Sequence, residues 1–225
     1  MALHQVQKQG DLKIDKLLIN LNAENRRVSV HGVSVELVRK QADSLGIPLE
    51  IMEIPAGSSM LDYDKMMDDR LQALQDSNYT HGIFGDILLE DLRNYREKQF
   101  SKAGIIPVFP LWKKDTRKLA ETFIESGHKA LIVCVNAAVL DQSFCGREFD
   151  KAFLSDLPEN VDLCGENGEF HTFVYDGPLF SQEIKVEVNQ VVSRSYKPNK
   201  KDKDDCFTKE QTWDVDFWFA DLLSE

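Results

Sequence analysis

A polar, glycine-rich segment precedes an apolar run in the sequence DLCGENGEFHTFVYDGP, which covers residues 162–178. Gly165 and Gly168 allow backbone shapes and close approaches that a side chain would forbid. The polar side chains between them and just after them could supply a cation ligand, an amide clamp and a proton carrier. These side chains are Glu166, Asn167, Glu169 and His171. The pattern favours a functional loop, and the alternative is a turn-rich connection whose carboxylates face water.

A second segment with chemical potential is GDILLEDLRNYRE, residues 85–97, which follows the apolar run THGIF. In open α/β sheets, ligands bind beyond the carboxyl ends of the strands. Gly85 would permit a close backbone approach there, and Asp86 would add a carboxylate that holds a metal or a ligand. Asp86 is equally suited to cap the next helix, and both roles are compatible.

The helix predicted after Asp86 has two faces at a 100° step per residue. One face carries Glu90, Arg93, Asn94 and Glu97, and the opposite face carries Leu88, Leu92 and Tyr95. Arg96 falls between Leu89 and Leu92, on the apolar side. Its guanidinium must therefore extend to water, pair with a buried carboxylate or reach an anionic ligand.

The segment RRVSVHG, residues 26–32, lies between a predicted strand and a predicted helix. His31 could bind phosphate or transfer a proton near neutral pH, although a single loop histidine often does neither. Arg27 is a further candidate for substrate binding in this segment.

These segments require strands and helices that alternate along the chain. Apolar strands are predicted at 16–21, 49–54, 80–85 and 105–112, with helices at 33–46, 61–75 and 88–100 between them. This order is typical of a parallel α/β sheet with crossover helices, which we assign to a domain of residues 1–112. A smaller α+β domain is predicted for residues 113–225, with helices at 115–126 and 146–154 and strands at 127–135, 171–177 and 183–196. Residues 197–205 read as a solvated loop, and the apolar C-terminus is expected to dock.

The composition limits the possible classes of function. Of 225 residues, 42% are hydrophobic, and 38 acidic against 27 basic residues give a net charge of -11. That charge disfavours broad binding of nucleic acid or of an anionic membrane. No membrane span or signal peptide is recognised, so a cytoplasmic location is expected. The four cysteines form no metal-binding spacing and are expected to be reduced; Cys134 is predicted to be a core residue, and Cys164 lies within the polar segment.

Three segments in order resemble the motifs of the diphthine–ammonia ligase family: RVSVHGV, GIFGDILLEDLRNYRE followed by FPLW, and CGENGEFHTFVYDGP. This family is a branch of the N-type ATP pyrophosphatases. The resemblance runs from about residue 17 to 192. It implies a Rossmann-like parallel sheet of the adenine nucleotide alpha-hydrolase-like type, followed by a smaller C-terminal α+β domain.

The resemblance also implies an enzyme that uses ATP and Mg²⁺ to adenylate a carboxylate, releases pyrophosphate, and lets ammonia displace AMP. The acid would be a small molecule or protein-borne, and diphthine itself is made only on an elongation factor of eukaryotes and archaea. The catalytic candidates are Asp86, Glu90, Glu166, Glu169 and His171. The substrate-binding candidates are Arg27, His31, Gly85, Asp91, Arg93, Tyr95, Arg96, Asn167 and Thr172. No dedicated metal-ligand set is assigned, and the two motif groups are expected to face one cleft.

The chain departs from the family pattern at its start. Family members begin with a strand and a glycine-rich S-G-G-K-D-S phosphate loop, whose helix continues in a form like MALHQVQK, where this chain begins. Leu163 also stands where the family commonly has proline. We interpret the sequence as a shortened one that lacks the first, central strand, since its neighbours would keep unpaired backbone groups. For the chain as it stands, we expect a split or gapped sheet and negligible ATP turnover.

Two alternatives remain open at this stage. One is a non-catalytic binding protein that keeps the cleft for the acid but has lost ATP hydrolysis. The other is a tRNA-modifying ATP pyrophosphatase, which the acidic composition and the lack of a basic stripe disfavour. Neither the acid substrate nor the oligomeric state is assigned.

Overall fold

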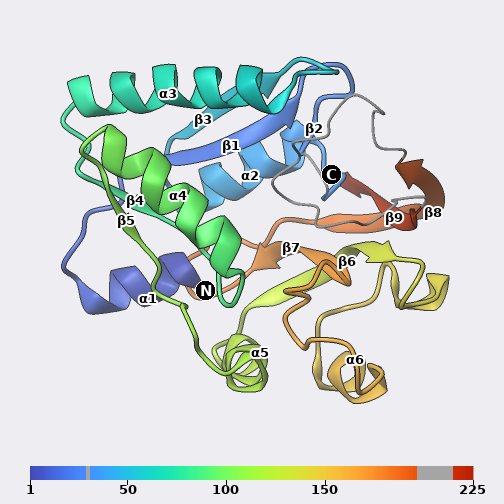
Figure 1. The fold of residues 1–225 in the computed structure, drawn as a ribbon. Coiled ribbons are helices and arrows are strands. Elements are labelled where there is room, and N and C mark those ends of the chain that lie inside the picture. The colour runs from blue at the N-terminus through green and yellow to red at the C-terminus, as the bar shows by residue number, and fades with distance from the viewer. Residues whose placement is uncertain (29–30, 197–214, 225) are drawn as a thin grey trace. The chain divides into compact units, whose positions relative to one another are not determined.

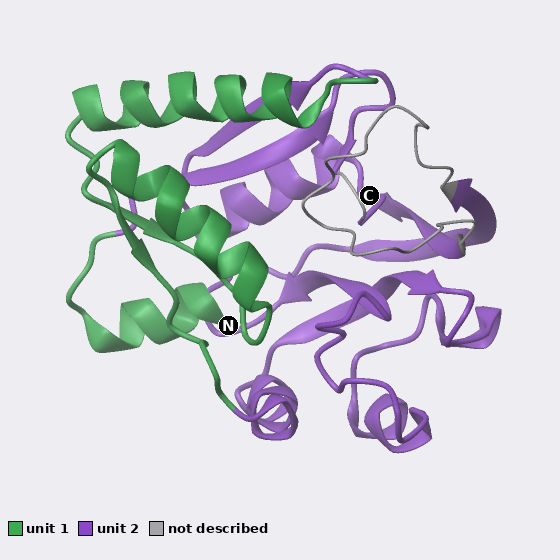
Figure 2. Cartoon of the chain, viewed as in Figure 1, with its two compact units in different colours: residues 1–13, 57–114, 199–211 green, residues 14–56, 115–198, 212–225 purple. Residues whose placement is uncertain are grey.

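The computed structural model describes residues 1–28, 31–196 and 215–224, and these cluster into two compact units (Figures 1 and 2). The first unit contains described residues 1–13 and 57–114, and the second contains those of 14–56, 115–196 and 215–224. The predicted division near residue 112 lies close to one of these boundaries, but residues 14–56 cluster with the second unit. The assignment of two functional domains stays a prediction. No helix in the described part of the chain is long and apolar enough to cross a membrane.

The first unit consists of three helices and two short strands within its described residues. They are α1 (Ala2–Gln9), α3 (Met60–Asp76), β4 (His81–Ile83), α4 (Glu90–Lys102) and β5 (Ile106–Val108). A capping box starts α3, because Ser59 and Asp62 each accept a hydrogen bond from the other's backbone N–H. The helix α4 begins at Glu90 rather than at Leu88, and its N-cap Leu89 makes no side-chain hydrogen bond.

The second unit contains the remaining described elements. They are β1 (Leu17–Asn22), β2 (Arg27–Val28), α2 (Val35–Leu45), β3 (Leu49–Ile54), α5 (Thr116–Glu125), β6 (Lys129–Asn136), η1 (Gln142–Phe144), α6 (Lys151–Asp156), β7 (Phe170–Asp176), β8 (Val186–Tyr196) and β9 (Val215–Ser224). Local sequence explains several boundaries: Ser34 caps α2, and Gly46 ends it with a left-handed φ of 65°. Most predicted elements are found, but the helix predicted at 146–154 forms only at Lys151–Asp156.

The parallel strands lie in two separate sheets instead of the single sheet predicted. Strands β1 and β3 are parallel over Leu17–Asn22 and Leu49–Ile54, with the short β2 antiparallel to β1. Strands β4 and β5 form a second parallel pair. The structure is thus of the α/β class with parallel portions, and the Rossmann-like arrangement stays a prediction.

A four-stranded antiparallel sheet of order β7-β6-β9-β8 holds the core of the second unit. The central strand β6 is buried from Ala130 to Val135, which explains its continuous apolar run. Phe153 of α6 is 0% exposed and meets the Phe170 ring edge-on, with the centroids 5.2 Å apart. Cys134 is buried in this core, as predicted.

The C-terminal strand β9 and its neighbour β8 differ from the sequence expectation. The apolar C-terminus was expected to dock, and it does so as a strand hydrogen-bonded to both β6 and β8. Strand β8 was predicted to be half-exposed, but most of its side chains face solvent. The predicted loop at 197–205 lies outside the described residues.

Side-chain contacts join the α2 segment to the sheet of the second unit. The Gln41 side-chain amide donates to the Val174 carbonyl of β7 at 2.5 Å. The Ser44 hydroxyl donates to the Gln182 carbonyl at 2.6 Å and accepts from the Gln182 N–H at 3.2 Å. These bonds give a physical reason why residues 14–56 cluster with the later part of the chain.

Candidate functional site

The first group of candidate residues lies at the carboxyl edge of β4 and β5. The Phe84 N–H continues the ladder by donating to the Val108 carbonyl at 2.9 Å, and the chain then leaves the sheet through Gly85 and Asp86. Gly85 is exposed, and an added Cβ there would meet no atom within 4 Å. The edge therefore offers backbone access at the place that ligands use in parallel sheets.

Asp86 and Arg96 form an ion pair at this edge. The Arg96 Nε atom lies 3.0 Å from the Asp86 Oδ2 atom, and the Asp86 side chain is only 9% exposed. The Arg96 guanidinium also lies over the Phe84 ring, 4.5 Å from its centroid. Pairing with a buried carboxylate was one of the alternatives predicted for Arg96. The capping role considered for Asp86 is wrong, because Leu89 occupies the N-cap of α4.

The ion pair leaves hydrogen-bonding capacity unused. Although 3.0 Å apart, the Arg96 Nε and Asp86 Oδ2 atoms form no hydrogen bond, and both atoms are buried. Charge attraction at this distance does not require a linear N–H···O arrangement, so the two observations are compatible. A buried polar atom without a hydrogen bond costs about 1–3 kcal/mol and calls for a functional or structural explanation.

Arg93, one helical turn before Arg96, is held by aromatic rings. Its guanidinium lies 4.6 Å from the Trp112 ring centroid and 4.9 Å from that of Phe109. Its Nε–H donates to Glu97 Oε1 at 2.7 Å. The prediction that Arg93 and Glu97 share one helix face is confirmed. The contact of Arg93 with aromatic rings was not predicted, although both rings belong to the segment FPLW.

The other candidates of this group have separate surroundings. Glu90 and Asp91 are exposed in the first turn of α4. The Tyr95 hydroxyl donates to Asp64 Oδ1, and burial together with that carboxylate raises the tyrosine pKa. Leu88, predicted to share an apolar face with Tyr95, precedes the helix and is 48% exposed. Tyr95 therefore serves packing between α3 and α4 within the first unit.

The second group of candidates is organised by Glu169 within the second unit. The Glu169 side chain is 5% exposed, and its carboxylate accepts the Asp162 N–H at 3.0 Å. It also accepts the backbone N–H and the side-chain amide of Asn167, each at 2.9 Å. Asp162 in turn accepts the N–H groups of Cys164 and Glu166. Glu169 and Asn167, predicted as catalytic and substrate-binding residues, thus shape this loop.

Two glycines of the loop adopt the left-handed backbone that the sequence suggested. Gly165 has a φ of 71° and Gly168 a φ of 81°. A Cβ on Gly165 would lie 2.6 Å from the Phe170 carbonyl oxygen, whereas one on Gly168 would meet nothing within 4 Å. Gly165 is therefore required both for its conformation and for close packing.

Two candidate histidines far apart in the sequence lie together in the second unit. The rings of His31 and His171 have centroids 4.4 Å apart and an interplanar angle of 34°. Burial lowers the pKa of both rings, to about 3 for His171, which the neighbouring His31 lowers further. A backbone hydrogen bond with Thr172 opposes the shift of the His31 pKa. The pair is therefore neutral at physiological pH, and a neutral imidazole can accept a proton or a hydrogen bond.

Arg27 is engaged in an ion pair that the sequence did not suggest. Its Nη2 atom donates to Asp221 Oδ1 of β9 at 2.6 Å, and its Nη1 atom donates to the Gly32 carbonyl at 2.5 Å. Gly32 packs against Phe219 of the same strand, where a Cβ would lie 2.6 Å from a ring carbon. These contacts fix the turn that carries His31, so Arg27 positions the histidine pair.

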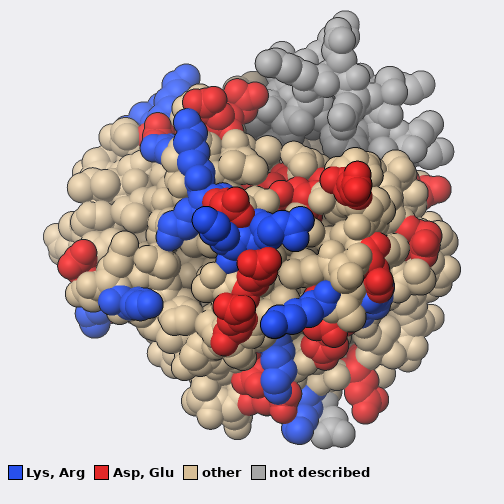
Figure 3. All heavy atoms as spheres, turned by 90° about the horizontal axis from the view of Figure 1, so that it is seen from below, with Lys and Arg blue, Asp and Glu red and all other residues tan. Residues whose placement is uncertain are grey.

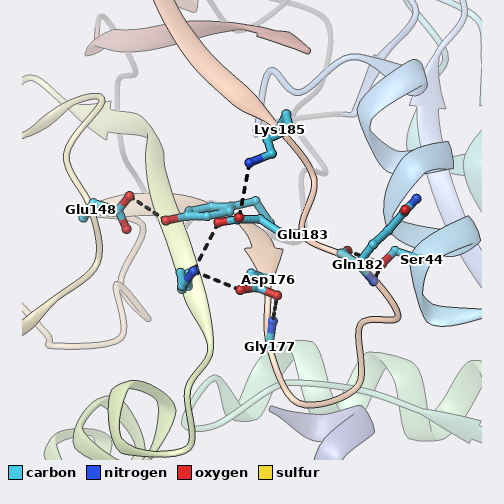
Figure 4. A network of polar contacts seen from close by, with 9 residues as sticks. Ser44, Glu148, Asp176, Gly177, Gln182, Glu183 and Lys185 are labelled. Carbon is cyan, nitrogen blue, oxygen red and sulfur yellow. Dashed lines mark hydrogen bonds and ion pairs between the residues drawn. The ribbon is translucent and has the colours of Figure 1, made fainter. Parts of the chain in front are cut away.

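A network of charged and polar groups fixes the opposite end of β7 from His171 (Figure 4). The Lys129 ammonium lies 3.0 Å from Asp176 Oδ2 and 3.1 Å from Glu183 Oε1. The Tyr175 hydroxyl donates to Glu148 Oε1 at 2.6 Å. Figure 4 also shows the labelled Lys185 directed at Glu183, whose Oε2 atom lies 3.7 Å from the Lys185 Nζ atom. Because Lys129 is half-exposed, we interpret this network as structural support for β7.

Neither a reactive thiol nor a ready metal centre is found in the described part of the chain. Cys164 donates to the Thr116 carbonyl at 3.3 Å, and burial raises the pKa of its thiol to about 12. No three His, Cys, Asp or Glu side chains converge as metal ligands among the described residues. On the face that Figure 3 shows, Lys and Arg side chains are interspersed with Asp and Glu side chains.

The two groups of candidates belong to different compact units. The structure brings Gly85, Asp86, Arg93 and Arg96 to one sheet edge, and it brings His31 together with His171 and Thr172. Glu166 lies in the loop that Glu169 shapes. The expectation that both groups face one cleft stays a prediction.

Comparison with known proteins adds independent evidence on the family. Residues 115–217 match the family described as diphthamide synthase C-terminal domain. The diphthine–ammonia ligase of Bos taurus is 30% identical over 131 residues, which are 56% of this chain and 49% of that protein. That of Danio rerio is 28% identical over 169 residues, 68% of this chain and 66% of that protein.

A fungal relative extends the similarity over more of this chain. The diphthine–ammonia ligase of Saccharomyces cerevisiae is 26% identical over 194 residues, which are 72% of this chain and 28% of that protein. The chain thus spans between about half and two thirds of the two vertebrate relatives and less of the yeast protein. These matches agree with the family resemblance predicted from the three motifs, that of the diphthine–ammonia ligases.

Proposed function

We propose that the chain takes part in ATP-dependent amide formation with ammonia as the nitrogen donor. The observation that carries this proposal is the match of residues 115–217 to a diphthamide synthase domain, together with relatives whose name joins diphthine to ammonia. The corresponding acid for this chain is diphthine or a similar carboxylate.

The proposed reaction has two steps. A carboxylate oxygen of the acid attacks the α-phosphorus of ATP, and pyrophosphate leaves with the electrons of the broken P–O bond. The ammonia nitrogen then attacks the acyl carbon, AMP leaves, and the nitrogen loses a proton to give the amide. Both steps need cationic groups to stabilise developing negative charge on phosphate, and the second step also needs a group that accepts the proton lost by the nitrogen.

Two arginines and two histidines of the chain are candidates for roles in these steps. Arg93 and Arg96 present positive charge at the carboxyl edge of β4 and β5, where a parallel sheet places ligands. The neutral rings of His31 and His171 can accept a hydrogen bond from ammonia, whereas their lowered pKa values make them weak bases. We assign Arg93 and Arg96 to anion binding, the two histidines to holding ammonia, and Asp86 to the positioning of Arg96.

We also propose an adenine nucleotide alpha-hydrolase-like arrangement for the parallel portions, which the β1–β3 and β4–β5 pairs support. Magnesium would enter with the phosphates of ATP, since this ion commonly uses only one or two protein carboxylates, and no larger ligand group converges among the described residues. Asp86 is the buried carboxylate at the carboxyl edge of β4 and β5, where this magnesium would lie. A cytoplasmic location is proposed because Cys134, Cys145 and Cys164 are unbridged.

The test measures AMP and pyrophosphate release from ATP with ammonium and a panel of carboxylates that includes a diphthine-bearing protein. It is run on the 225-residue chain and on the same chain extended by a strand and an S-G-G-K-D-S phosphate loop. We expect release that needs both the acid and ammonium in the extended chain. If neither form releases AMP while the acid still binds, the protein is a binding protein and the enzyme proposal is refuted.

A matched pair of variants tests the assignment at the sheet edge. Asp86→Asn should lower the ammonia-dependent rate of the extended chain by roughly tenfold or more, because it removes the negative charge that positions Arg96. Glu159→Gln, an exposed residue of the second unit, serves as the control and should leave the rate unchanged. Equal rates for the two variants would remove Asp86 from the assignment.

A further inference from the structure

Three cationic side chains lie near the edge of β4 and β5. Besides Arg93 and Arg96, Lys113 contributes an ammonium 5.9 Å from the Trp112 ring centroid. Arg93 pairs with Glu97 and Arg96 pairs with Asp86. Among the described residues, Lys113 makes no such pair, so its ammonium is the positive charge left for a ligand of opposite sign.

Lys113 is held there by the backbone. Its φ of 56° is in the left-handed region, which costs a residue with a side chain about 1–2 kcal/mol. Its N–H donates to the Ile87 carbonyl at 2.8 Å, which ties the turn after β5 to the turn after β4. Backbone strain of this kind persists where the surrounding structure requires it, as it does between these two turns.

The aromatic rings form a continuous support beneath the two guanidinium groups. The Phe84 and Phe109 rings are stacked with centroids 5.3 Å apart, and the Phe109 and Trp112 centroids are 6.3 Å apart. Arg96 lies over Phe84, and Arg93 lies over Phe109 and Trp112. A guanidinium that stacks on a ring keeps its N–H donors directed outward from its edge.

Arg96 differs from Arg93 and Arg147, which also stack on rings, because its buried Nε atom makes no hydrogen bond. Arg93 donates to Glu97 at 2.7 Å, and Arg147 of the second unit donates to Asp156 at 2.7 Å. Arg96 makes no hydrogen bond to another described residue, although its side chain is only 32% exposed. Its partner Asp86 is nine-tenths buried and also has an oxygen without a hydrogen bond.

We propose that Arg93, Arg96 and Lys113 form an oxyanion-binding site, in which Arg96 donates its free N–H groups to a phosphate or carboxylate group. The identity of the oxyanion as a substrate group rests on the proposed function, since the nucleotide and the acid both carry one. Asp86 holds the guanidinium by charge alone and leaves its forked donors available, which is the geometry that planar oxyanions need.

The test follows the Arg96 Nε–H signal by nuclear magnetic resonance while sodium pyrophosphate, AMP or sodium acetate is added to the 225-residue chain. The signal is identified by its loss in Arg96→Lys. We expect a saturable shift with at least one of the three anions. A shift with pyrophosphate or AMP assigns the site to the nucleotide, and a shift with acetate alone assigns it to the acid. No shift with any of them at millimolar concentration overturns the proposal.

Variants separate this site from general charge effects. Arg96→Gln should weaken binding of the active anion by roughly tenfold or more, because it removes a charged donor group. Arg147→Gln is the matched control, since Arg147 also stacks on rings and pairs with a carboxylate, and it should bind as the wild type does. Equal affinity for Arg96→Gln and the wild type would overturn the proposal. If Arg96→Gln fails to fold, the wild-type shift and the weaker binding of Arg96→Lys decide.

These binding measurements need no catalysis, so their outcome is distinct from that of the ligase assay. Oxyanion binding at Arg96 without AMP release would keep this site and refute the enzyme. Ammonia-dependent AMP release that is unchanged in Arg96→Gln would keep the enzyme and overturn this site.

Discussion

Replacement of Glu169 should first affect the stability of the second unit, because this carboxylate is a structural acceptor. It is 5% exposed and accepts three N–H groups, one from Asp162 at 3.0 Å and two from Asn167 at 2.9 Å. A hydrogen bond to a charged group contributes about 1.5–3 kcal/mol. Asn167 is exposed, so its donors can bind water in a variant, whereas the partly buried Asp162 N–H loses its partner.

We therefore expect Glu169→Ala to lower the free energy of unfolding by about 2–4 kcal/mol. Glu169→Gln should lower it by about 1–2 kcal/mol, because its amide keeps one acceptor oxygen and turns an NH₂ group toward a donor. Urea unfolding followed by circular dichroism measures the loss. Amide hydrogen exchange at positions 162 and 167 shows whether the loss is local to this loop.

Glu159→Ala is the control for this prediction, since Glu159 is exposed a few residues before the loop. Its effect should stay within about 0.5 kcal/mol of the wild type. If Glu169→Ala matches that control, or if the amides of Asp162 and Asn167 remain equally protected, the structural role assigned to Glu169 is wrong.

Three further outcomes are expected. Burial lowers the pKa of His171 to about 3, so the folded state disfavours its protonation, and the free energy of unfolding should fall below pH 6.5 by up to about 1.4 kcal/mol per pH unit. Urea unfolding at pH 7 and pH 5 should show a smaller fall for His171→Gln than for the wild type. Gly165→Ala should destabilise more than Gly168→Ala in thermal unfolding, because both have a left-handed φ but only Gly165 would also bring its Cβ to 2.6 Å from a carbonyl oxygen. Arg27→Gln and Asp221→Asn should each lower the free energy of unfolding by about 1–2 kcal/mol at pH 7, and the double variant should lose less than the sum of the two. Because Arg27 lowers the pKa of Asp221, this coupling should disappear in unfolding experiments as the pH falls through the lowered pKa of Asp221.

Local elements were largely predictable from sequence, whereas their pairing was not. The strand predicted at 49–54 is found at Leu49–Ile54, because its apolar run ends at clear turn residues. The helix predicted at 33–46 is found at Val35–Leu45, between the Ser34 cap and Gly46. Strands β6 and β9, in contrast, pair in a register that places Cys134 opposite Phe219. Pairing over such sequence separation depends on the whole sheet and leaves no local pattern.

The site residues show the same limit. The sequence selected Arg96 and gave a buried carboxylate as one of three alternatives for it, but only the structure identifies that carboxylate as Asp86. The sequence also selected His31 and His171 separately, and their stacking depends on how the turn after β2 meets β7. Arg27 was predicted to bind substrate, yet it pairs with Asp221, because a C-terminal strand crosses the same region.

The two groups of candidate residues differ in how their polar atoms are satisfied, and this difference predicts how each responds to substitution. Glu169 uses three internal donors and needs no ligand to be stable, so its variants should lose folding free energy before they lose binding. The Asp86 Oδ2 and Arg96 Nε atoms are buried without a hydrogen bond, so the folded state already carries their cost. An anion that binds the exposed end of the Arg96 side chain should therefore stabilise the first unit, while substitution of Arg96 should change binding more than stability.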